Sequence, residues 1–237
     1  MNKISLSLIL PIHNQEDITA SVVSEIVKDL NKNKILFEIL LVENGSTDNT
    51  YTVVKKLDKN NSHIRALTAK KGYGSAIIKG LHSAKGEYVC YMPSDGQLDS
   101  KLVAKLYKII TKESYDLVKI KRISRESILR SIRSKGFNIL TKLLFRIPVE
   151  DINGSPRIFL RNWLPILKIQ FKDSFIDTEM AIKAYYLRWE IKEVPAITFP
   201  RKGGKSTVSI KTVIEFIENL FRYKISNKLK TWINSST

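Results

Sequence analysis

The sequence predicts an α/β fold in which a mostly parallel sheet is covered by helices on both faces. Apolar, strand-like runs alternate with segments of helical spacing from the start of the chain to about residue 92. Most of the strand-like runs end in polar, turn-forming residues, as strands that lead into helices do. The 237 residues have an apolar fraction of 43%, which is enough for a sizeable core.

The first half of the chain supplies four strands and three helices in alternation. The helices are identified by apolar residues at helical spacing, such as Ile18, Val22 and Ile26 in the first of them. That helix is expected to start at Asp17 or Thr19, because both residue types cap helices well. The predicted elements are strands at 4–12, 37–42, 64–68 and 88–92, and helices at about 17–30, 53–57 and 75–84.

The second half is less regular. From 212 to 233 apolar residues recur at helical spacing among basic ones, a pattern suited to a membrane surface or to a partner. We therefore expect a main domain at 1–210 and a basic amphipathic helix at 211–237. Packing on the domain is an equally good interpretation of this helix. The other predicted elements are helices at 102–110, 128–144 and 177–187, and strands at 116–122 and 189–195.

Positive charge is concentrated in the second half. The net charge is +17, with 16 basic against 13 acidic residues in 1–116 and 24 against 10 in 117–237. This asymmetry indicates an anionic partner such as a membrane face, a phosphorylated substrate or nucleic acid. We rank nucleic acid last, since no nucleic-acid-binding motif accompanies the charge.

The sequence is typical of a cytoplasmic protein. Cys90 is the single cysteine, so an internal disulfide is excluded, and its apolar neighbours predict a packing role. No segment approaches the roughly 18–20 consecutive apolar residues of a membrane span. The apolar run at the amino terminus leads into Pro11 rather than a cleavage site, so we interpret it as a strand.

Polar loops follow the first four strands and are expected to line one crevice. The carboxyl ends of parallel strands meet at one edge of the sheet, where ligands of open α/β folds bind. Asp95 and Gln97 stand two residues apart just after the fourth strand. Their hard oxygen atoms suit Mg²⁺ or Mn²⁺. The loops concerned are 13–17, 43–50, 70–75 and 93–99.

Four motifs in order resemble the family 2 glycosyltransferases of the GT-A fold. They are Pro11-Ile-His-Asn-Gln-Glu, Glu38-Ile-Leu-Leu-Val-Glu-Asn-Gly-Ser-Thr-Asp48, Lys71-Gly-Tyr-Gly and Tyr91-Met-Pro-Ser-Asp-Gly-Gln97. Two later segments, Asp151-Ile-Asn-Gly-Ser-Pro-Arg157 and Glu193-Val-Pro to Ser206, are similar to motifs of the polyprenyl-phosphate sugar transferases, the dolichol-phosphate mannose synthase-like group. The resemblance covers about residues 5–210.

The resemblance implies roles for individual residues. It implies a nucleotide-sugar donor, linked to GDP or UDP, and a polyprenyl phosphate acceptor at the inner face of a membrane. Arg201 matches an arginine of the mobile acceptor loop, and Asp95 with Gln97 matches part of an Asp-x-Asp-x-Gln metal site. The other donor-binding or phosphate-binding positions are Pro11, His13, Gln15, Val42, Asn44, Lys71, Gly72, Ser94, Arg122, Arg130 and Ser134.

The chain departs from the family pattern at three places. Pro93 stands where the family has the first carboxylate of the metal motif. Glu43-Asn44 replaces a pair of aspartates, and Thr207 replaces a lysine. Donor binding is therefore better supported than metal dependence. Metal would stabilise charge on the leaving nucleoside diphosphate, and basic residues are the alternative source of that stabilisation.

Catalysis on a lipid phosphate needs little general base, because the acceptor is already anionic. If one acts, Asp177 or Glu179 near a predicted helix start is the candidate. Two other functions stay open: transfer onto a glycan or protein acceptor, and a degenerate homologue that only binds donor. The basic segment Arg201-Lys-Gly-Gly-Lys-Ser favours the lipid phosphate, since a neutral hydroxyl acceptor does not require it.

Overall fold

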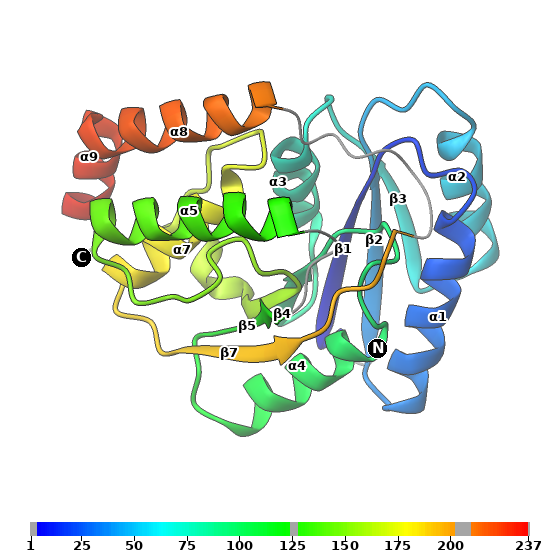
Figure 1. Cartoon of the computed structure of the whole chain (residues 1–237). Coiled ribbons are helices and arrows are strands. Elements are labelled where there is room, and N and C mark those ends of the chain that lie inside the picture. Colours follow the sequence, from blue (N-terminus) through cyan, green and yellow to red (C-terminus); the bar gives the residue numbers. More distant parts are fainter. Residues whose placement is uncertain (1–3, 124–127, 202–209, 237) are drawn as a thin grey trace.

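A computed structural model of the chain confirms the α/β architecture (Figure 1). The structure describes residues 4–123, 128–201 and 210–236, and at 128–135 and 210–213 it describes the backbone only. Within these residues the strands form one seven-stranded sheet of order β3-β2-β1-β4-β6-β5-β7. All neighbouring pairs are parallel except those of β6, which runs antiparallel to both β4 and β5.

The first half folds as predicted. Strand β1 pairs in parallel with β2 on one side and β4 on the other, with Leu6 opposite both Phe37 and Tyr88. Helix α1 begins at Thr19, the second of the two predicted starts. The elements are β1 (Leu6–Ile12), α1 (Thr19–Lys32), β2 (Phe37–Glu43), α2 (Thr50–Asn60), β3 (Ile64–Thr68), α3 (Tyr73–Ser83) and β4 (Tyr88–Tyr91).

The second half adds a strand that the sequence did not reveal. Strand β6 (Arg157–Leu160) lies between β4 and β5, and its buried side chains complete the sheet. The short helices η1 (Arg161–Trp163) and α6 (Leu164–Leu167) follow it and were not predicted either. The other elements are α4 (Lys101–Lys112), β5 (Leu117–Arg122), α5 (Ile128–Phe145), α7 (Ile176–Tyr186) and β7 (Ile191–Ala196).

Alternation along the strands separates two cores. Leu8 and Leu10 of β1 face a cluster that contains α1 and α4, whereas Ile9 faces a cluster that contains α3 and α7. Side chains of a strand point alternately to its two faces, so one apolar strand supports both layers. Cys90 is fully buried in β4 with no disulfide, which confirms its packing role.

The predicted helix at 212–233 is two helices. Helix α8 (Ile210–Ile225) ends before Ser226 and α9 (Asn227–Ser236) follows it. Leu220 and Trp232 are buried in a third apolar cluster with Phe145 of α5 and Ile182 of α7. The indole Nε1 of Trp232 donates to the carbonyl of Ile166 over 2.8 Å. The inner face of this pair of helices therefore packs on the main domain.

Among the described helices, none has both the length and the apolar character that crossing a bilayer requires.

Candidate active site

The loops after β1 and β2 are joined by hydrogen bonds. Asn14, with φ of 50°, donates its backbone N–H to Ser46 Oγ over 3.1 Å and accepts from the N–H of Thr47 over 2.8 Å. The carboxylate of Glu16 accepts from the N–H of Asn49 over 2.7 Å. These reciprocal bonds join the two loops at the carboxyl edge of the sheet, where the sequence predicts a crevice. They use polar turn residues that tolerate left-handed backbone, as Asn does.

Ser94 ties the loop after β4 to the loop after β1. Its Oγ lies 2.7 Å from the carbonyl oxygen of Pro11 and 2.5 Å from Oε1 of Gln15. Gln15 is buried and donates its backbone N–H to Thr50 Oγ1 over 2.8 Å. Predicted donor-binding residues from two motifs are thus brought together. The side chains of Ser94 and Gln15 support the crevice from below and position its loops.

Asp95 is buried at the head of this loop and is paired with a cation. Its Oδ1 accepts from the backbone N–H of Gln97 over 3.3 Å, and its Oδ2 lies 3.3 Å from Nη2 of Arg201. Only 5% of Asp95 is exposed, so the charge of this carboxylate is weakly screened by solvent. The structure therefore brings together two residues predicted from motifs 106 positions apart in the sequence.

The segment after β7 crosses the loop after β4. Phe199 donates its N–H to the carbonyl of Gln97 over 2.8 Å, and the Gln97 side-chain Nε2 donates to the carbonyl of Phe199 over 3.3 Å. This pairing places Arg201, two residues after Phe199, close to Asp95. The rest of the predicted basic segment, Lys202 to Ser206, lies outside the described residues.

The oxygen donors of Asp95 and Gln97 fit a divalent metal only when oxygens of a bound diphosphate complete the coordination shell of the metal. Asp95 supplies one carboxylate, Gln97 one carboxamide, and Pro93 has no side-chain oxygen. In the parts of the chain that the structure describes, no three His, Cys, Asp or Glu side chains are grouped to hold a metal. Asp95 already faces the guanidinium of Arg201, so its environment accommodates positive charge. A hard cation bridging to a diphosphate fits this donor set.

The loop after β2 presents Asn44 to the start of α3. Asn44 Nδ2 donates to the carbonyl of Gly72 over 3.0 Å, while its buried Oδ1 has no hydrogen-bond partner among the described residues. Glu43 accepts from the N–H of Ser46 over 2.5 Å, so it closes the turn after β2. Val42 is fully buried inside β2. Asn44 thus lies at the crevice edge with an unused acceptor, whereas Val42 only supports it.

Gly72 and Gly74 permit close packing of α3 on a distant segment. A Cβ on Gly74 would lie 2.3 Å from the carbonyl oxygen of Phe171, and one on Gly72 would lie 2.6 Å from that of Lys172. Gly72 also has φ of 137°. Ser75 donates its N–H to the carbonyl of Lys172 over 2.9 Å. The glycines of the Lys71-Gly-Tyr-Gly motif therefore have a packing reason that does not involve a phosphate.

His13 is the first residue of the loop after β1. Its ring Nδ1 is buried and has no hydrogen-bond partner among the residues that the structure describes. A buried polar atom without a partner is costly and marks a place where a ligand or water is expected. Pro11, near the end of β1, contributes its carbonyl to the contact with Ser94.

Asp177 is buried in a cluster beneath the crevice. Nη2 of Arg157 lies 3.3 Å from its Oδ1, and Nη1 of Arg157 donates to its backbone carbonyl over 2.9 Å. The guanidinium also lies 5.3 Å from the ring centroid of Tyr91. Burial raises the pKa of Asp177, and the charge of Arg157 opposes this shift. Asp177 is therefore held by a permanent cation and is poorly placed to exchange protons with solvent.

Glu179 holds a loop in place. Its carboxylate accepts from the N–H of Gln170 and of Phe171, both over 3.0 Å at the nearer oxygen, and from Lys183 Nζ over 2.7 Å. Lys183 also donates to the carbonyl of Lys168 over 2.9 Å. The fully buried carboxylate of Glu179 thus binds the segment that packs on Gly72 and Gly74. These hydrogen bonds explain its burial without a proton-transfer role.

Arg122 forms a bidentate ion pair with Asp151. Its Nε and Nη2 donate to the two carboxylate oxygens, each over 2.8 Å. Hydrogen bonds and charge from Arg122 outweigh the burial of Asp151 and hold the pKa of that carboxyl below its usual value. Lys119 also donates to the Asp151 carbonyl and lies 3.2 Å from Glu193 Oε1. Burial lowers the pKa of Lys119 to about 8.

Two predicted phosphate-binding side chains cannot be placed. Arg130 and Ser134 belong to α5, but their side chains lie outside the described residues. The structure instead shows charged residues that the sequence did not single out, namely the fully buried Arg157 and Lys119. Arg157 stands in a quoted motif, yet only the fold places it against Asp177. A lysine inside an apolar strand was the one available signal for Lys119.

The mostly parallel sheet with helices on both faces, and with Asp95 and Arg201 paired at the carboxyl edge, is an α/β architecture of the GT-A type. A family model, "Glycosyl transferase family 2", matches residues 7–165. The chain therefore belongs to this family.

Two characterised relatives carry names that describe transferases. A dolichyl-phosphate beta-glucosyltransferase of Dictyostelium discoideum is 25% identical over 98% of this chain and 77% of the relative. The glycosyltransferase AglD of Haloferax volcanii is 22% identical over 92% of this chain and 37% of the relative.

Solved structures of low sequence identity share the fold. Glucosyl-3-phosphoglycerate synthase from Mycobacterium tuberculosis, in complex with Mn²⁺, UDP-glucose and phosphoglyceric acid, has a TM-score of 0.74 at 18% identity. That alignment covers 93% of this chain and 79% of the other. Staphylococcus aureus TarS 1–349 in complex with UDP-GlcNAc has a TM-score of 0.60 at 18% identity, covering 91% and 65%.

Proposed function

We propose that the chain transfers a sugar from a UDP- or GDP-linked donor to polyprenyl phosphate at the cytoplasmic face of a membrane. The observation that carries the proposal is an amphiphilic site: a buried Asp95 paired with Arg201, beside exposed apolar side chains. Ile197 and Phe199, in the segment that crosses the loop after β4, are 54% and 48% exposed. A charged grip next to an apolar row suits an acceptor with a phosphate head and a hydrocarbon chain.

The apolar row extends across two strands. The N–H of Ile123 donates to the carbonyl of Ala196 over 3.0 Å, which continues the parallel register of β5 and β7. Ile123 is 60% exposed and in this register lies beside Ile197. Three large apolar side chains exposed beside a polar crevice are costly unless a ligand covers them. An isoprenoid chain is such a ligand.

Donor binding is proposed for the loops at the carboxyl edge of β1, β2 and β4. Parallel α/β sheets bind nucleotides at this edge. The orphaned Nδ1 of His13 and Oδ1 of Asn44 are the hydrogen-bonding atoms this edge leaves for a nucleotide. Pro11, Gln15, Val42, Lys71, Gly72 and Ser94 complete the set predicted to bind or shape the donor site.

Asp95 and Gln97 would hold Mg²⁺ or Mn²⁺ together with oxygens of the donor diphosphate. When bound, such an ion stabilises the negative charge that grows on the leaving nucleoside diphosphate. Arg201 would exchange its contact with Asp95 for the acceptor phosphate, since guanidinium binds phosphate and carboxylate with the same fork geometry. Arg122, Arg130 and Ser134 stay predicted as further phosphate contacts.

The proposed reaction is a single displacement at the anomeric carbon of the sugar. A phosphate oxygen of the acceptor forms a bond to that carbon, and the bond to the donor diphosphate breaks with its electron pair leaving on the nucleotide. The acceptor oxygen carries no proton at neutral pH, so no general base is required. The burial of Asp177 against Arg157 is consistent with a reaction that needs no general base.

A panel of radiolabelled nucleotide sugars tests the proposal. Each donor is incubated with the full chain and undecaprenyl or dolichyl phosphate, with and without EDTA, and the chloroform-soluble label is counted. We expect one donor to give a labelled lipid. Label in the lipid at equal rates with EDTA would remove the metal from the proposal, and absence of labelled lipid for every donor would remove the lipid acceptor.

A further inference from the structure

We propose that the outer faces of α5 and α8 form a surface that binds an anionic lipid bilayer. Twelve large apolar side chains are exposed among the described residues, and half of them lie on these two helices. We call this group the α5–α8 face. It consists of Ile139 and Leu143 of α5 and of Ile214, Ile217, Phe221 and Ile225 of α8.

The residues of α8 form a stripe. Ile214, Ile217, Phe221 and Ile225 are spaced by three and four residues, so they lie on one side of the helix. Phe216, Leu220 and Tyr223 lie on the opposite side and pack into the third apolar cluster. One apolar stripe thus accounts for folding, while the other is exposed and is not needed for it.

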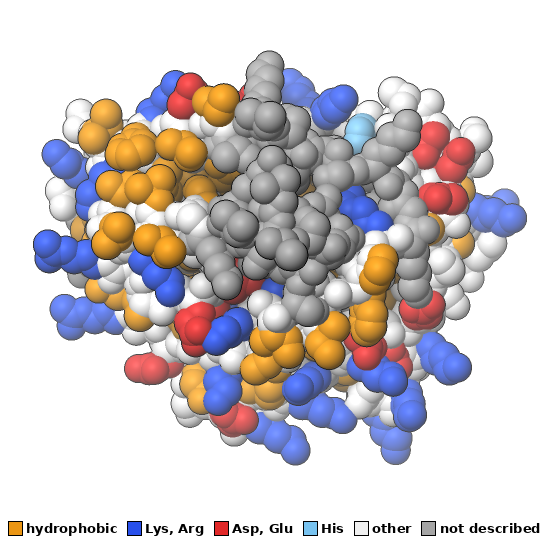
Figure 2. Space-filling model, in the orientation of Figure 1, with side chains coloured by type: hydrophobic (Ala, Val, Ile, Leu, Met, Phe, Trp, Pro, Cys, Tyr) orange, Lys and Arg blue, Asp and Glu red, His pale blue; other side chains and the backbone are white. Residues whose placement is uncertain are grey.

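The two helices lie side by side and run in the same direction (Figure 1). Near the middle of each helix the rings of Phe137 and Phe216 have centroids 5.3 Å apart, and near their ends those of Phe145 and Tyr223 are 6.3 Å apart. On the same helix as Phe137 and Phe145, Leu143 is 74% exposed. Figure 2 shows hydrophobic side chains gathered over α5 and α8. Two parallel helices give a flat apolar surface of the kind that lies in a bilayer interface.

Charge selects lipid over a second copy of the chain. The described part of α8 and α9 carries more exposed cations than exposed acids, which are Glu215 and Glu218. Of the exposed acids beside the helices, Glu150 is paired with Lys121 and Asp173 accepts a hydrogen bond from Asn219. A two-fold dimer through this face would bring two surfaces of net positive charge together, whereas anionic headgroups neutralise that charge. The exposed cations are Arg146, Arg222, Lys224, Lys228 and Lys230.

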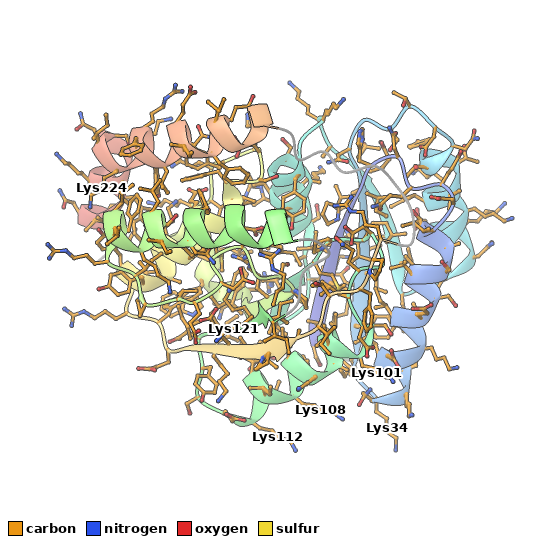
Figure 3. All side chains as sticks on the ribbon, in the orientation of Figure 1. Lys34, Lys101, Lys108, Lys112, Lys121 and Lys224 are labelled. Atoms are coloured by element: carbon orange, nitrogen blue, oxygen red, sulfur yellow. The ribbon has the colours of Figure 1, made fainter. Side chains whose placement is uncertain are left out.

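Charge alone does not select this face of the molecule. Figure 3 shows Lys34, Lys101, Lys108 and Lys112 along the edge formed by α4 and the end of α1, away from Lys224 at the end of α8. Pairing of cations with exposed apolar side chains distinguishes the α5–α8 face. Both helices also follow crevice residues in the chain: α5 starts six residues after Arg122, and α8 nine after Arg201. In so far as the proposed function holds, this position brings the crevice to the source of a lipid acceptor.

Vesicle flotation of the full chain tests the surface. The vesicles are phosphatidylcholine with and without phosphatidylglycerol, and the variants are Leu143→Glu and Phe221→Glu, singly and together. Tyr51→Glu is the matched control, because Tyr51 is 48% exposed on α2. Lys108→Glu on α4 tests the other basic edge. Circular dichroism checks that each variant is folded.

We expect wild type and Tyr51→Glu to float with anionic vesicles and the double variant to bind them at least about tenfold more weakly, since each change removes a large apolar contact. Equal binding by the double variant, or loss only in Lys108→Glu, would overturn the proposal. So would a wild type that binds no vesicle but becomes monomeric on Phe221→Glu in light scattering.

The outcome can be separated from that of the proposed function. Transfer is also measured with a short-chain polyprenyl phosphate dissolved in detergent, where no bilayer is needed. Loss of vesicle binding with transfer retained supports the surface alone. Vesicle binding that depends on the α5–α8 face, with no transfer to any lipid acceptor, supports the surface and refutes the proposed function.

Discussion

Substitution of Gly74 by alanine tests whether the glycine motif serves packing. An added Cβ would lie 2.3 Å from the carbonyl oxygen of Phe171 and 2.5 Å from that of Asp173. Both are backbone atoms, and Glu179 holds their segment through the N–H of Phe171. The start of α3 must therefore move away, which weakens the bond from Ser75 N–H to the Lys172 carbonyl.

The expected cost of Gly74→Ala is about 2 kcal/mol. Overpacking costs roughly 1–3 kcal/mol and a weakened hydrogen bond about 1 kcal/mol, against a gain of up to about 1 kcal/mol in helix propensity. Gly136 provides the control, because a Cβ there meets nothing within 4 Å on an exposed position of α5. Gly136→Ala is expected to stabilise the chain by about 0.5–1 kcal/mol.

Urea unfolding of the two variants and of wild type, followed by circular dichroism, measures these differences. Donor binding by calorimetry is measured in parallel. A Gly74→Ala protein as stable as wild type would refute the packing argument. If that protein also lost donor binding, the glycine would be assigned to the donor after all.

Three further substitutions test the site. Arg201→Ala should reduce transfer by about 10²-fold while leaving donor affinity within a few-fold, because Arg201 is assigned to the acceptor; loss of donor affinity would reassign it. Pro93→Asp should tighten Mn²⁺ binding in the presence of nucleotide by at least about tenfold, as second-shell changes alone shift metal affinity this much; unchanged binding in paramagnetic resonance titrations would show that position 93 does not face the metal. Asp151→Asn should be destabilising near pH 6 and less so near pH 2. The folded pKa of Asp151 is lowered by Arg122, so its stabilising contribution is present above the usual carboxyl pKa and is lost as pH falls through the folded value. A cost of Asp151→Asn that does not change with pH in urea titrations would contradict the assignment.

The sequence predicted the parallel half of the fold well because β1, β2 and β4 are largely apolar on both faces and the helices have a clear apolar side. It missed β6 for a physical reason. Arg157–Leu160 is four residues long, and its first residue is a charged side chain buried by contacts from distant segments. The spacing of apolar residues within a short segment does not reveal such contacts. The break between α8 and α9 was missed because apolar spacing continues across Ser226.

The candidate site was predicted best where motif and strand end coincide. Asp95, Ser94, Gln15 and Asn44 lie at one edge because topology alone places them there. The assignment of charged residues away from that edge depended on partners that sequence cannot supply. Glu179 meets the amides of a loop that was not predicted to pack on it.

Arg122 is a second charged residue whose partner could not be predicted from the sequence. A basic residue at the end of β5 is consistent with a phosphate grip, and its partner Asp151 is 29 residues away in the sequence. Only the fold shows that Nε and Nη2 of the guanidinium already donate to the carboxylate of Asp151. A phosphate at this position would compete with the carboxylate of Asp151 for the guanidinium.

The most direct test of the account compares wild type with Asp95→Asn in transfer of a radiolabelled sugar to polyprenyl phosphate. The account predicts label in the chloroform phase with wild type and a loss of roughly 10²-fold or more with Asp95→Asn. The reason is that the Asp95 carboxylate is proposed to hold the cation that stabilises the donor diphosphate. Equal transfer by the two proteins would contradict the central place given to Asp95.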